Sequence, residues 1–255
     1  MLNRLGNKKT MAVKTCRHFP AGYRAFIDLF FGAGGIFFSG AKARFNFLND
    51  IDDDIANLYL VVQSRSEELI SAIQLVPIST RLLEHWKLNK ETDPIKKAVR
   101  FLFLSNFTYL GKGDTLRMNI GHPKQNIIDG ISKVLHFIGE AIITNYDFRE
   151  VVSKISFSDK VLRRSECFLY LDPPYLDTEH NYGAPKWAKD DTHDCLEILS
   201  TYGMPGAMSE FNHPFVISNA QKMGLNIIHL GGRRNIKNRG QEVLITNYQP
   251  NLLFM

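Results

Sequence analysis

The segment Asp172-Pro173-Pro174-Tyr175 has the residue types of a rigid site that could hold an amino group. A residue before proline is kept extended, and two consecutive prolines fix the chain. The loop therefore displays the Asp172 carboxylate, the Pro173 carbonyl and the Tyr175 ring. The two acceptors could pull an aromatic amine towards tetrahedral geometry and aim its lone pair at an electrophile. The plainer alternative is a turn with an exposed aspartate and a packed tyrosine.

A second group of residues combines glycines with a carboxylate. The apolar run 26–30 leads into Gly32, Gly34 and Gly35, and glycine lets the backbone approach a ligand closely. Asp50 ends the next apolar run, 18 residues after Gly32. An acid at roughly this spacing can accept hydrogen bonds from both ribose hydroxyls of a nucleoside cofactor. A glycine loop without such an acid would more often be a simple tight turn.

The spacing of these glycines favours one nucleoside cofactor over another. Gly32, Gly34 and Gly35 do not form the GxGxxG pattern that cradles a pyrophosphate. S-adenosylmethionine has no phosphate and needs acceptors for a ribose and an ammonium group, and Asp28 could lie near the latter. The sequence therefore favours S-adenosylmethionine over NAD. A nicotinamide-dependent oxidoreductase is further disfavoured because the chain lacks a matching catalytic base pattern.

The elements that position these residues are short apolar runs separated by helical stretches. Strands apolar on both faces are typical of a parallel sheet covered on both sides, whose ligands lie at the carboxyl ends of the strands. We therefore predict an α/β fold with a mostly parallel central sheet and its chemistry along one rim. The expected strands are 26–30, 45–48, 141–143, 168–171, 215–219 and 243–248.

Residues 57–137 interrupt this alternation. They are mainly helical in pattern, over 66–76, 94–105 and 126–137, and the segment 106–119 around Gly111-Lys112-Gly113 predicts a hairpin tip or exposed loop. We expect one catalytic unit, 1–56 with 138–255, and one insertion, 57–137. Ser218-Asn219 would cap a strand or help to shape the site.

Basic residues form two sets that could neutralise phosphates, although any single one of them could be a solvated surface charge. Tyr109 could stack on a base or pack within the insertion, and Tyr182 and Trp187 could line a base pocket, with Trp187 equally suited to the core. The first set is Lys96, Lys97, Arg100, Lys112, Arg117 and Lys124, and the second, expected in a loop near the rim, is Arg233, Arg234, Lys237 and Arg239.

Composition narrows the class of protein. The 255 residues are 44% hydrophobic and 22% charged, which suits one large α/β domain with an insertion, and the net charge of +5 mildly favours a polyanionic partner. Three separated cysteines argue against zinc and disulfides, and the eight histidines show no metal spacing. We expect no signal peptide, no membrane span and a cytoplasmic protein.

Taken in order, these motifs resemble the Dam-like, D12-class adenine-N6 DNA methyltransferases over nearly the whole chain. The match comprises Gly6-Asn7-Lys8, the glycine loop 28–35, Asn49-Asp50, Tyr146-Asp147-Phe148, the loop 172–175 and the strand 242–248. Arg4 or Leu5 departs from it, because relatives often have an aromatic residue there. The resemblance implies a Rossmann-like S-adenosylmethionine-dependent fold in which 57–137 is the target-recognition domain.

The resemblance also implies roles for individual residues, with no metal site. Asp172, Pro173, Pro174 and Tyr175 would be catalytic. The cofactor would contact Lys8, Asp28, Phe30, Gly32, Gly34, Asp50, Asp147 and Phe148. DNA would contact Tyr109, Lys112, Arg117, Tyr182, Arg233 and Arg234.

The implied activity is site-specific methyl transfer from S-adenosylmethionine to N6 of a flipped adenine in double-stranded DNA. The enzyme would be a monomer when free, in a bacterium or encoded by a phage in a bacterial host, with a cognate restriction endonuclease as a functional partner. A catalytically inactive DNA-binding module of the same fold and an RNA methyltransferase remain alternatives. Asp172 argues against cytosine-N4 enzymes, which more often have serine at that position.

Overall fold

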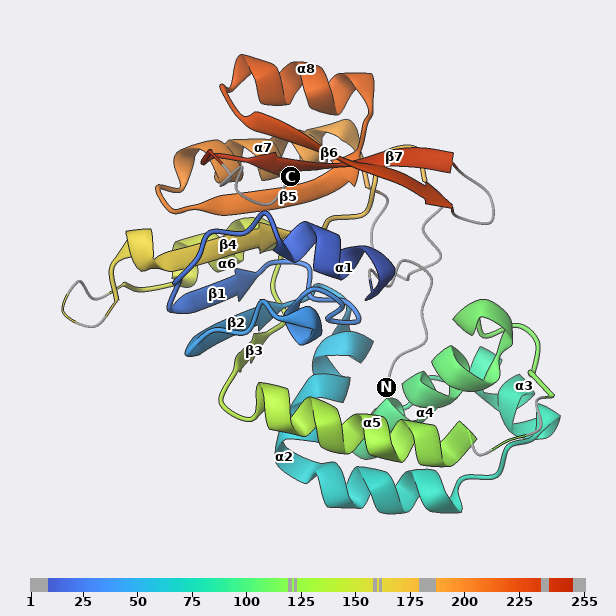
Figure 1. Ribbon diagram of the computed structural model, residues 1–255. Coiled ribbons are helices and arrows are strands. Elements are labelled where there is room, and N and C mark those ends of the chain that lie inside the picture. Colours follow the sequence, from blue (N-terminus) through green and yellow to red (C-terminus); the bar gives the residue numbers. More distant parts are fainter. Residues whose placement is uncertain are drawn as a thin grey trace.

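The computed structural model of the protein describes residues 9–118, 121, 123–157, 160, 162–178, 187–234 and 239–249 (Figure 1). Its centre is a seven-stranded sheet in the order β3-β2-β1-β4-β5-β7-β6. Adjacent strands from β3 to β5 pair in parallel, whereas β7 runs antiparallel to both of its neighbours. The predicted mostly parallel sheet is confirmed. The strands are β1 Ala25–Asp28, β2 Phe45–Asn49, β3 Ile142–Thr144, β4 Cys167–Leu171, β5 Gly206–Phe211, β6 Asn226–Arg234 and β7 Arg239–Thr246.

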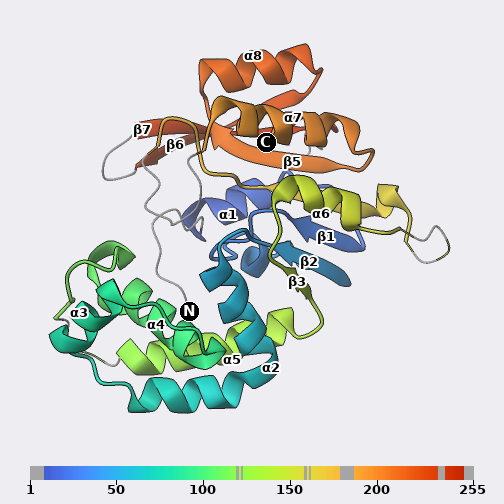
Figure 2. The ribbon, with the colours of Figure 1, turned by 180° about the vertical axis from the view of Figure 1, so that it is seen from behind.

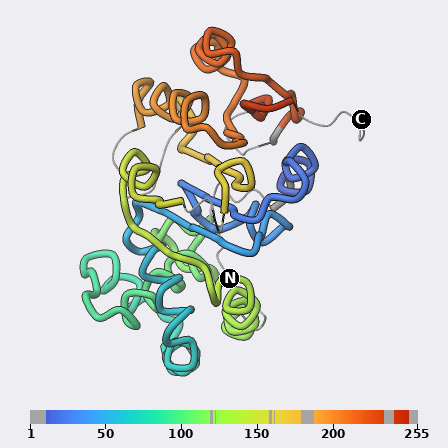
Figure 3. Tube along the Cα trace, turned by 90° about the vertical axis from the view of Figure 1, so that its left-hand side faces the viewer, coloured from blue at the N-terminus to red at the C-terminus, as the bar shows by residue number. Residues whose placement is uncertain are grey.

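Helices cover both faces of this sheet, as the views from behind and from the side show (Figures 2 and 3). Helix α1 (Lys9–Cys16), η1 (Phe37–Ser39) and the start of α2 (Asp53–Leu75) pack on the first face. Helices α6 (Phe148–Lys154), α7 (Lys189–Thr201) and α8 (Pro214–Lys222) pack on the second. Side chains alternate along each strand, so Phe168 and Tyr170 point to the first face and Leu169 to the second. This double burial explains the unbroken apolar runs.

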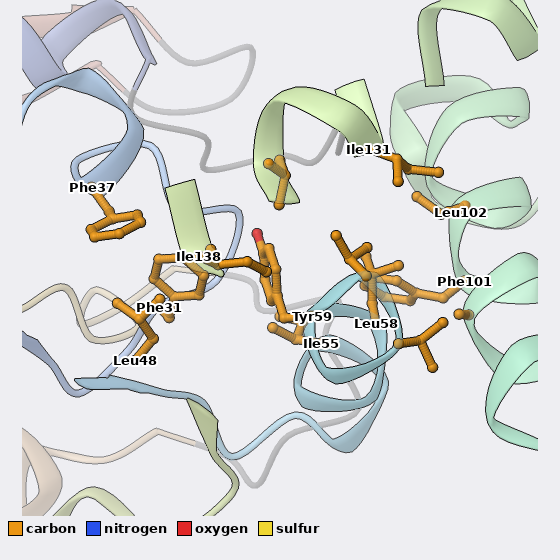
Figure 4. Packing of buried hydrophobic residues seen from close by; sticks show 14 of the residues in the cluster. Phe31, Phe37, Leu48, Ile55, Leu58, Tyr59, Phe101, Leu102, Ile131 and Ile138 are labelled. Carbon is orange, nitrogen blue, oxygen red and sulfur yellow. The ribbon is translucent and has the colours of Figure 1, made fainter. Parts of the chain in front are cut away.

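The insertion is helical and shares its core with the sheet. Figure 4 shows the continuity, from Phe31 and Leu48 through Tyr59 of α2 to Leu102 and Ile131, all in one buried cluster. Helix α2 leaves helical geometry at Arg65 (φ −141°, ψ 37°), which divides it into two segments. The helices of residues 57–137 are therefore packed onto the sheet through α2. Its further elements are α3 Thr80–Leu88, α4 Pro94–Phe107, η2 Tyr109–Gly111 and α5 Pro123–Ile138.

The prediction of a strand over 215–219 is wrong, because these residues lie in α8. Pro214 occupies the first turn, and the His213 ring nitrogen accepts a hydrogen bond from the Phe215 N–H, which caps the helix. Only Val216 and Ala220 are buried, four residues apart, as one face of a helix requires. Ser218 and Asn219 therefore do not cap a strand, and Asn219 hydrogen-bonds back to the Phe215 carbonyl.

Two strands, β5 and β6, were not predicted from the sequence. Strand β5 contains buried polar residues, Ser209 and Glu210, which break the apolar pattern. The basic cluster expected in a loop belongs partly to a hairpin, because β6 ends at Arg234 and β7 begins at Arg239, and these two residues pair. Their neighbour Lys237 lies outside the described residues.

Two further findings concern the chain as a whole. Cys16, Cys167 and Cys195 all carry free thiols. Among the helices of the described part of the chain, none combines the length and the apolar character needed to cross a bilayer.

A short turn, η3 (Arg164–Glu166), holds the amino ends of β1 and β4 together through Glu166. The carboxylate accepts hydrogen bonds from the Arg163 backbone N–H (3.0 Å) and the Arg24 guanidinium (3.1 Å), which lower the pKa of Glu166 from 4.5 to about 2. Because the folded pKa lies below the ordinary value, this stabilisation is present above pH 4.5 and is lost as the pH falls through 2.

We therefore expect Glu166→Gln to lower the thermal unfolding midpoint at pH 7 and to approach wild type as the pH falls below 4.5. Thermal scans of both proteins across this pH range would measure the difference. If the variant's unfolding midpoint were lower by the same amount at every pH, the turn would require the shape of the Glu166 side chain and not its charge.

Candidate active site

The carboxyl ends of β1, β2 and β4 lie in register at one rim of the sheet. Asp28, the last residue of β1, is paired with Leu48 of β2 on one side and with Tyr170 of β4 on the other. The residues that follow these strands are the glycine loop, Asp50 and Asp172. The glycine loop and Asp50, which are 18 residues apart, are thus brought to the same edge as Asp172, which lies more than 100 positions further along the sequence.

Asp50 contacts the glycine loop directly. Its Oδ2 accepts a 2.7 Å hydrogen bond from the Gly32 N–H, and its Oδ1 accepts one of 2.9 Å from Asp52. The Tyr59 hydroxyl donates to the Gly32 carbonyl from the other side. Gly32 and Gly34 have φ of +52° and +69°, and a Cβ on Gly34 would lie 2.3 Å from the Phe38 ring. The loop therefore requires glycine, and the half-buried carboxylate fixes its shape.

Asn49 is a residue whose part in the site the sequence did not reveal. Its side-chain amide donates to the carbonyls of Leu29 (3.1 Å) and Tyr146 (2.9 Å). Its oxygen accepts from the Thr144 hydroxyl and the Tyr146 N–H. One buried side chain thus joins the ends of β1, β2 and β3. A buried amide that ends an apolar strand was the available signal, because such a group must find partners.

Asp28 is a buried carboxylate at the base of the glycine loop, 3% exposed. Its Oδ1 accepts a hydrogen bond of 3.1 Å from the Phe30 N–H, which turns the chain out of β1. The sequence expectation placed Asp28 near the cofactor's ammonium group. Its position beneath the loop is consistent with that expectation and gives it a structural role as well.

Three aromatic rings lie together beside the loop. The rings of Phe30 and Phe148 are 5.1 Å apart, and Trp187 packs on both, at 5.6 and 5.7 Å. Asp147 caps α6 through the Arg149 N–H, and the Arg149 guanidinium lies over Phe148. Trp187, for which the sequence left a base pocket and the core as alternatives, packs against the core of the second face through this cluster.

The Asp-Pro-Pro-Tyr loop leaves the end of β4 and is held at its last residue. Asp172 is half-buried, whereas Tyr175 is only 9% exposed. The Tyr175 hydroxyl donates to Glu242 Oε1 at 3.2 Å, and its ring meets Phe211 edge-on at 4.6 Å. Burial, then the charges of Asp172 and Glu242, raises the pKa of Tyr175 well above its ordinary value. The Tyr175 hydroxyl therefore keeps its proton to a higher pH than an ordinary tyrosine, so it can donate to Glu242.

Comparison with known proteins identifies the family. The model of the D12 class N6 adenine-specific DNA methyltransferases matches residues 5–242. The chain belongs to this family. The resemblance inferred from the motifs is confirmed, and the Rossmann-like methyltransferase fold expected from it agrees with the observed sheet.

Individual relatives give the same picture. The chain is 30% identical to the DNA adenine methylase of Escherichia coli (strain K12) over 182 residues, which cover 67% of this chain and 62% of that protein. It is 24% identical to the modification methylase StsI of Streptococcus sanguinis, over 97% of this chain and 42% of that protein. The chain thus spans less than two thirds of these relatives' lengths. Among solved structures, Trm5b from Pyrococcus abyssi has a TM-score of 0.36 and 15% identity, covering 96% of this chain and 49% of that one, which is too remote to bear on function.

In this methyltransferase family member, the loop after α4 presents polar and aromatic side chains to solvent. Thr108 and Leu116 form an antiparallel bridge, and the Tyr109 N–H donates to the Thr115 carbonyl. Tyr109 is 63% exposed at the tip, and Lys112 is exposed beside it. The segment predicted as a hairpin tip or an exposed loop is a loop closed by this single bridge, and Tyr109 does not pack inside the insertion. Arg117, further along the loop, is half-buried.

Three of the basic residues of the first set have partners within the protein. Lys97 pairs with Asp53 and lies 3.9 Å from Asp54, and Arg100 donates to the carbonyl of Trp86. Lys124 donates to the Gln74 carbonyl. Lys96 is exposed. Lys97 and Arg100 therefore join α2, α3 and α4, so that Lys96 and Lys112 are better placed for phosphates.

Several expected site residues cannot be placed. Lys8, Tyr182 and the departing positions Arg4 and Leu5 lie outside the described residues, and of Arg233 and Arg234 only the backbone, at the end of β6, is described. On α7, His193, Asp194 and Glu197 bring ligand atoms within 4.8 Å of one another, a grouping that a search for histidine spacing misses. Asp194 already binds Arg149 at 2.6 Å.

Proposed function

We propose that this protein transfers the methyl group of S-adenosylmethionine to N6 of an adenine in double-stranded DNA, at a specific sequence. The observation that carries the proposal is the common rim. The Asp-Pro-Pro-Tyr loop, the glycine loop and Asp50 lie on adjacent strand ends of a chain from this family. Its relatives named DNA adenine methylase and modification methylase support the same activity.

The residues present suit S-adenosylmethionine, which would supply an electrophilic methyl on a sulfonium. Asp50 is the acceptor for the ribose hydroxyls, and the Phe30–Phe148–Trp187 cluster offers apolar faces for the adenine ring. Gly32 keeps a side chain out of the approach, Gly34 lets the loop pack closely on the Phe31 and Phe38 rings, and the buried Asp28 at the start of the loop is proposed for the ammonium end. Lys8 and Asp147 complete the proposed set.

The chain's own part in the chemistry is positioning and electrostatics. Asp172 and the Pro173 carbonyl accept hydrogen bonds from the N6 amino group, which directs its lone pair at the methyl. Pro174 stiffens the loop, and the Tyr175 ring forms the wall for a base that has left the duplex. After methyl transfer, the N6 amino group loses one proton. Asp172 is the proposed acceptor of that proton.

We further propose that residues 57–137 read the DNA target. The hairpin tip brings Tyr109 and Lys112 outward, with Arg117 behind them, and Arg233 and Arg234 lie at the end of β6 for contact with the backbone. The protein would act as a free monomer in the cytoplasm of a bacterium or phage host. A cognate restriction endonuclease is its proposed functional partner, on the analogy of the modification methylase.

The test is to incubate the protein with duplex DNA and labelled S-adenosylmethionine, digest the DNA and identify the labelled nucleoside. N6-methyladenine is the expected product. Label only in N4-methylcytosine, or none in DNA of varied sequence, would contradict the proposal. Parallel incubation with RNA separates the RNA methyltransferase alternative. If S-adenosylhomocysteine bound but no substrate were methylated, the inactive-module alternative would be favoured.

A further inference from the structure

Two buried glutamates lie beside the Asp-Pro-Pro-Tyr loop, Glu210 near the carboxyl end of β5 and Glu242 near the amino end of the antiparallel strand β7. Glu210 of β5 is 0% exposed and Glu242 of β7 is 1% exposed. They are diagonal neighbours, because Glu242 pairs with Phe211 and Glu210 pairs with Val243. A carboxylate buried at this depth costs several kcal/mol unless its hydrogen bonds are supplied. Their presence calls for a role that an apolar residue could not fill.

The two carboxylates approach the loop from opposite faces of the sheet. Glu242 is two residues from Leu244, which packs in the first-face cluster, and Glu210 is two residues from Met208, which packs in the second. Between them they hold the end of the loop. Glu242 Oε1 accepts the Tyr175 hydroxyl at 3.2 Å, and Glu210 Oε2 accepts the Leu176 backbone N–H at 3.3 Å.

The loop is thus fixed at both of its ends. Strand β4 holds it up to Leu171 through the sheet, and the glutamates hold Tyr175 and Leu176. Only three residues separate these anchors, and two of them are prolines with a fixed φ. A displacement of Tyr175 would therefore be passed to Pro173 and Asp172, the groups proposed to hold the amino group.

We propose that Glu242 is a positioning residue for methyl transfer, which, with Glu210, sets the place of Asp172 by holding Tyr175 and Leu176. The inference rests on the proposed function and extends it to residues that do not touch the substrate. Misplacing a reacting group by about 1 Å can cost about 10²-fold in rate. Loss of this anchor should therefore appear in the rate of the chemical step and not in cofactor affinity.

The alternative is that Glu242 merely satisfies a buried hydroxyl and contributes to stability alone. The chain offers a matched control in the pair Tyr170–Ser209, whose hydroxyls are 2.7 Å apart. This pair is buried on the same face, between the adjacent strands β4 and β5, but Tyr170 belongs to the strand and not to the loop. Ser209→Ala removes a partner from a buried tyrosine and leaves the loop anchor in place.

The experiment compares wild type, Glu242→Gln, Glu242→Ala, Tyr175→Phe and Ser209→Ala with duplex DNA. Single-turnover methylation rate, cofactor Kd and thermal midpoint are measured for each. We expect Glu242→Ala and Tyr175→Phe to slow the single turnover by about tenfold or more with unchanged cofactor Kd. Glu242→Gln retains an oxygen acceptor for the Tyr175 hydroxyl and should recover most of the rate. Ser209→Ala should lower the thermal midpoint but keep the wild-type rate.

Tyr175→Phe keeps the inference testable if Glu242→Ala does not fold, because it deletes one hydroxyl and preserves the ring. Full single-turnover rate in Tyr175→Phe, or equal slowing in Ser209→Ala and Glu242→Ala, would overturn the positioning role. The double variant Tyr175→Phe/Glu242→Ala should be no slower than the slower single variant, because the two substitutions break the same hydrogen bond. If wild type itself methylates no adenine, the proposed function fails, a result distinct from either of these.

Discussion

Asp172→Ala should lower kcat for adenine methylation by about 10³-fold while leaving the Kd for S-adenosylhomocysteine unchanged, because a group that stabilises developing charge acts mainly in the transition state. Asp172 follows the end of β4, whereas the Phe30–Phe148–Trp187 cluster is built from the glycine loop, α6 and the residues before α7. Removing its carboxylate deletes an acceptor for the amino group but none of the proposed cofactor contacts. Rapid-quench methylation assays and calorimetry measure the two quantities separately.

Two further variants sharpen this expectation. Asp172→Asn keeps the shape and one oxygen acceptor but introduces an N–H donor that faces the substrate amine, so it should also be severely slowed. Asp177→Asn is the matched control, since it changes a carboxylate five residues later whose side chain is 78% exposed and pairs with His213. It should retain the wild-type rate. Weakened DNA affinity with normal kcat in Asp172→Ala would show that its assigned role is wrong.

Asp50→Ala should raise the Kd for S-adenosylhomocysteine by about 10²-fold, because hydrogen bonds to a charged group contribute about 1.5–3 kcal/mol each. The same change frees the Gly32 N–H from its 2.7 Å contact, so the glycine loop also loses its anchor. At saturating cofactor, kcat should recover towards wild type. This outcome separates Asp50, which acts in binding, from Asp172, which acts in turnover.

The protein supplies an optical probe for this measurement. It has two tryptophans, and Trp86 is buried in the insertion against Phe103, 5.0 Å away. In a Trp86→Phe background, the fluorescence of Trp187 reports directly on the aromatic cluster beside the glycine loop.

Asp50→Asn, which can still accept a hydrogen bond from the Gly32 N–H, should bind S-adenosylhomocysteine more tightly than Asp50→Ala. Asp53→Asn is the control, because this exposed acid pairs with Lys97 and surface ion pairs contribute little to stability. Wild-type affinity in Asp50→Ala would contradict the assignment.

The sequence located the three strand ends of the candidate site better than it located the rest of the sheet. The glycine loop, Asp50 and the Asp-Pro-Pro-Tyr loop follow strands β1, β2 and β4, whose apolar runs are unambiguous because both faces are buried. Parallel pairing then brings their ends together whatever lies between them. Helices over α2, α4 and α5 were also predicted, with Asp93 capping α4 and Pro94 in its first turn, whereas α3 was not.

What could not be predicted depends on long-range partners. Glu210 and Ser209 made β5 look unlike a buried strand, and only the folded chain provides Leu176, Phe211 and Tyr170 to satisfy them. The short apolar run of α8 suits a strand or a helix equally until its capping by His213 is known. Asn49 and Trp187 likewise acquire their partners from segments distant in sequence, so their roles follow from the structure alone.

We infer that the protein methylates adenine N6 in DNA at the loop that begins with Asp172. The most direct measurement is mass spectrometry of nucleosides from the DNA of cells that lack adenine methylation of their own and express either wild type or Asp172→Ala. Wild type should produce N6-methyladenine, confined to one short sequence context when the same DNA is sequenced for modified bases, and Asp172→Ala should produce none. N4-methylcytosine alone, or equal N6-methyladenine from both proteins, would contradict the account.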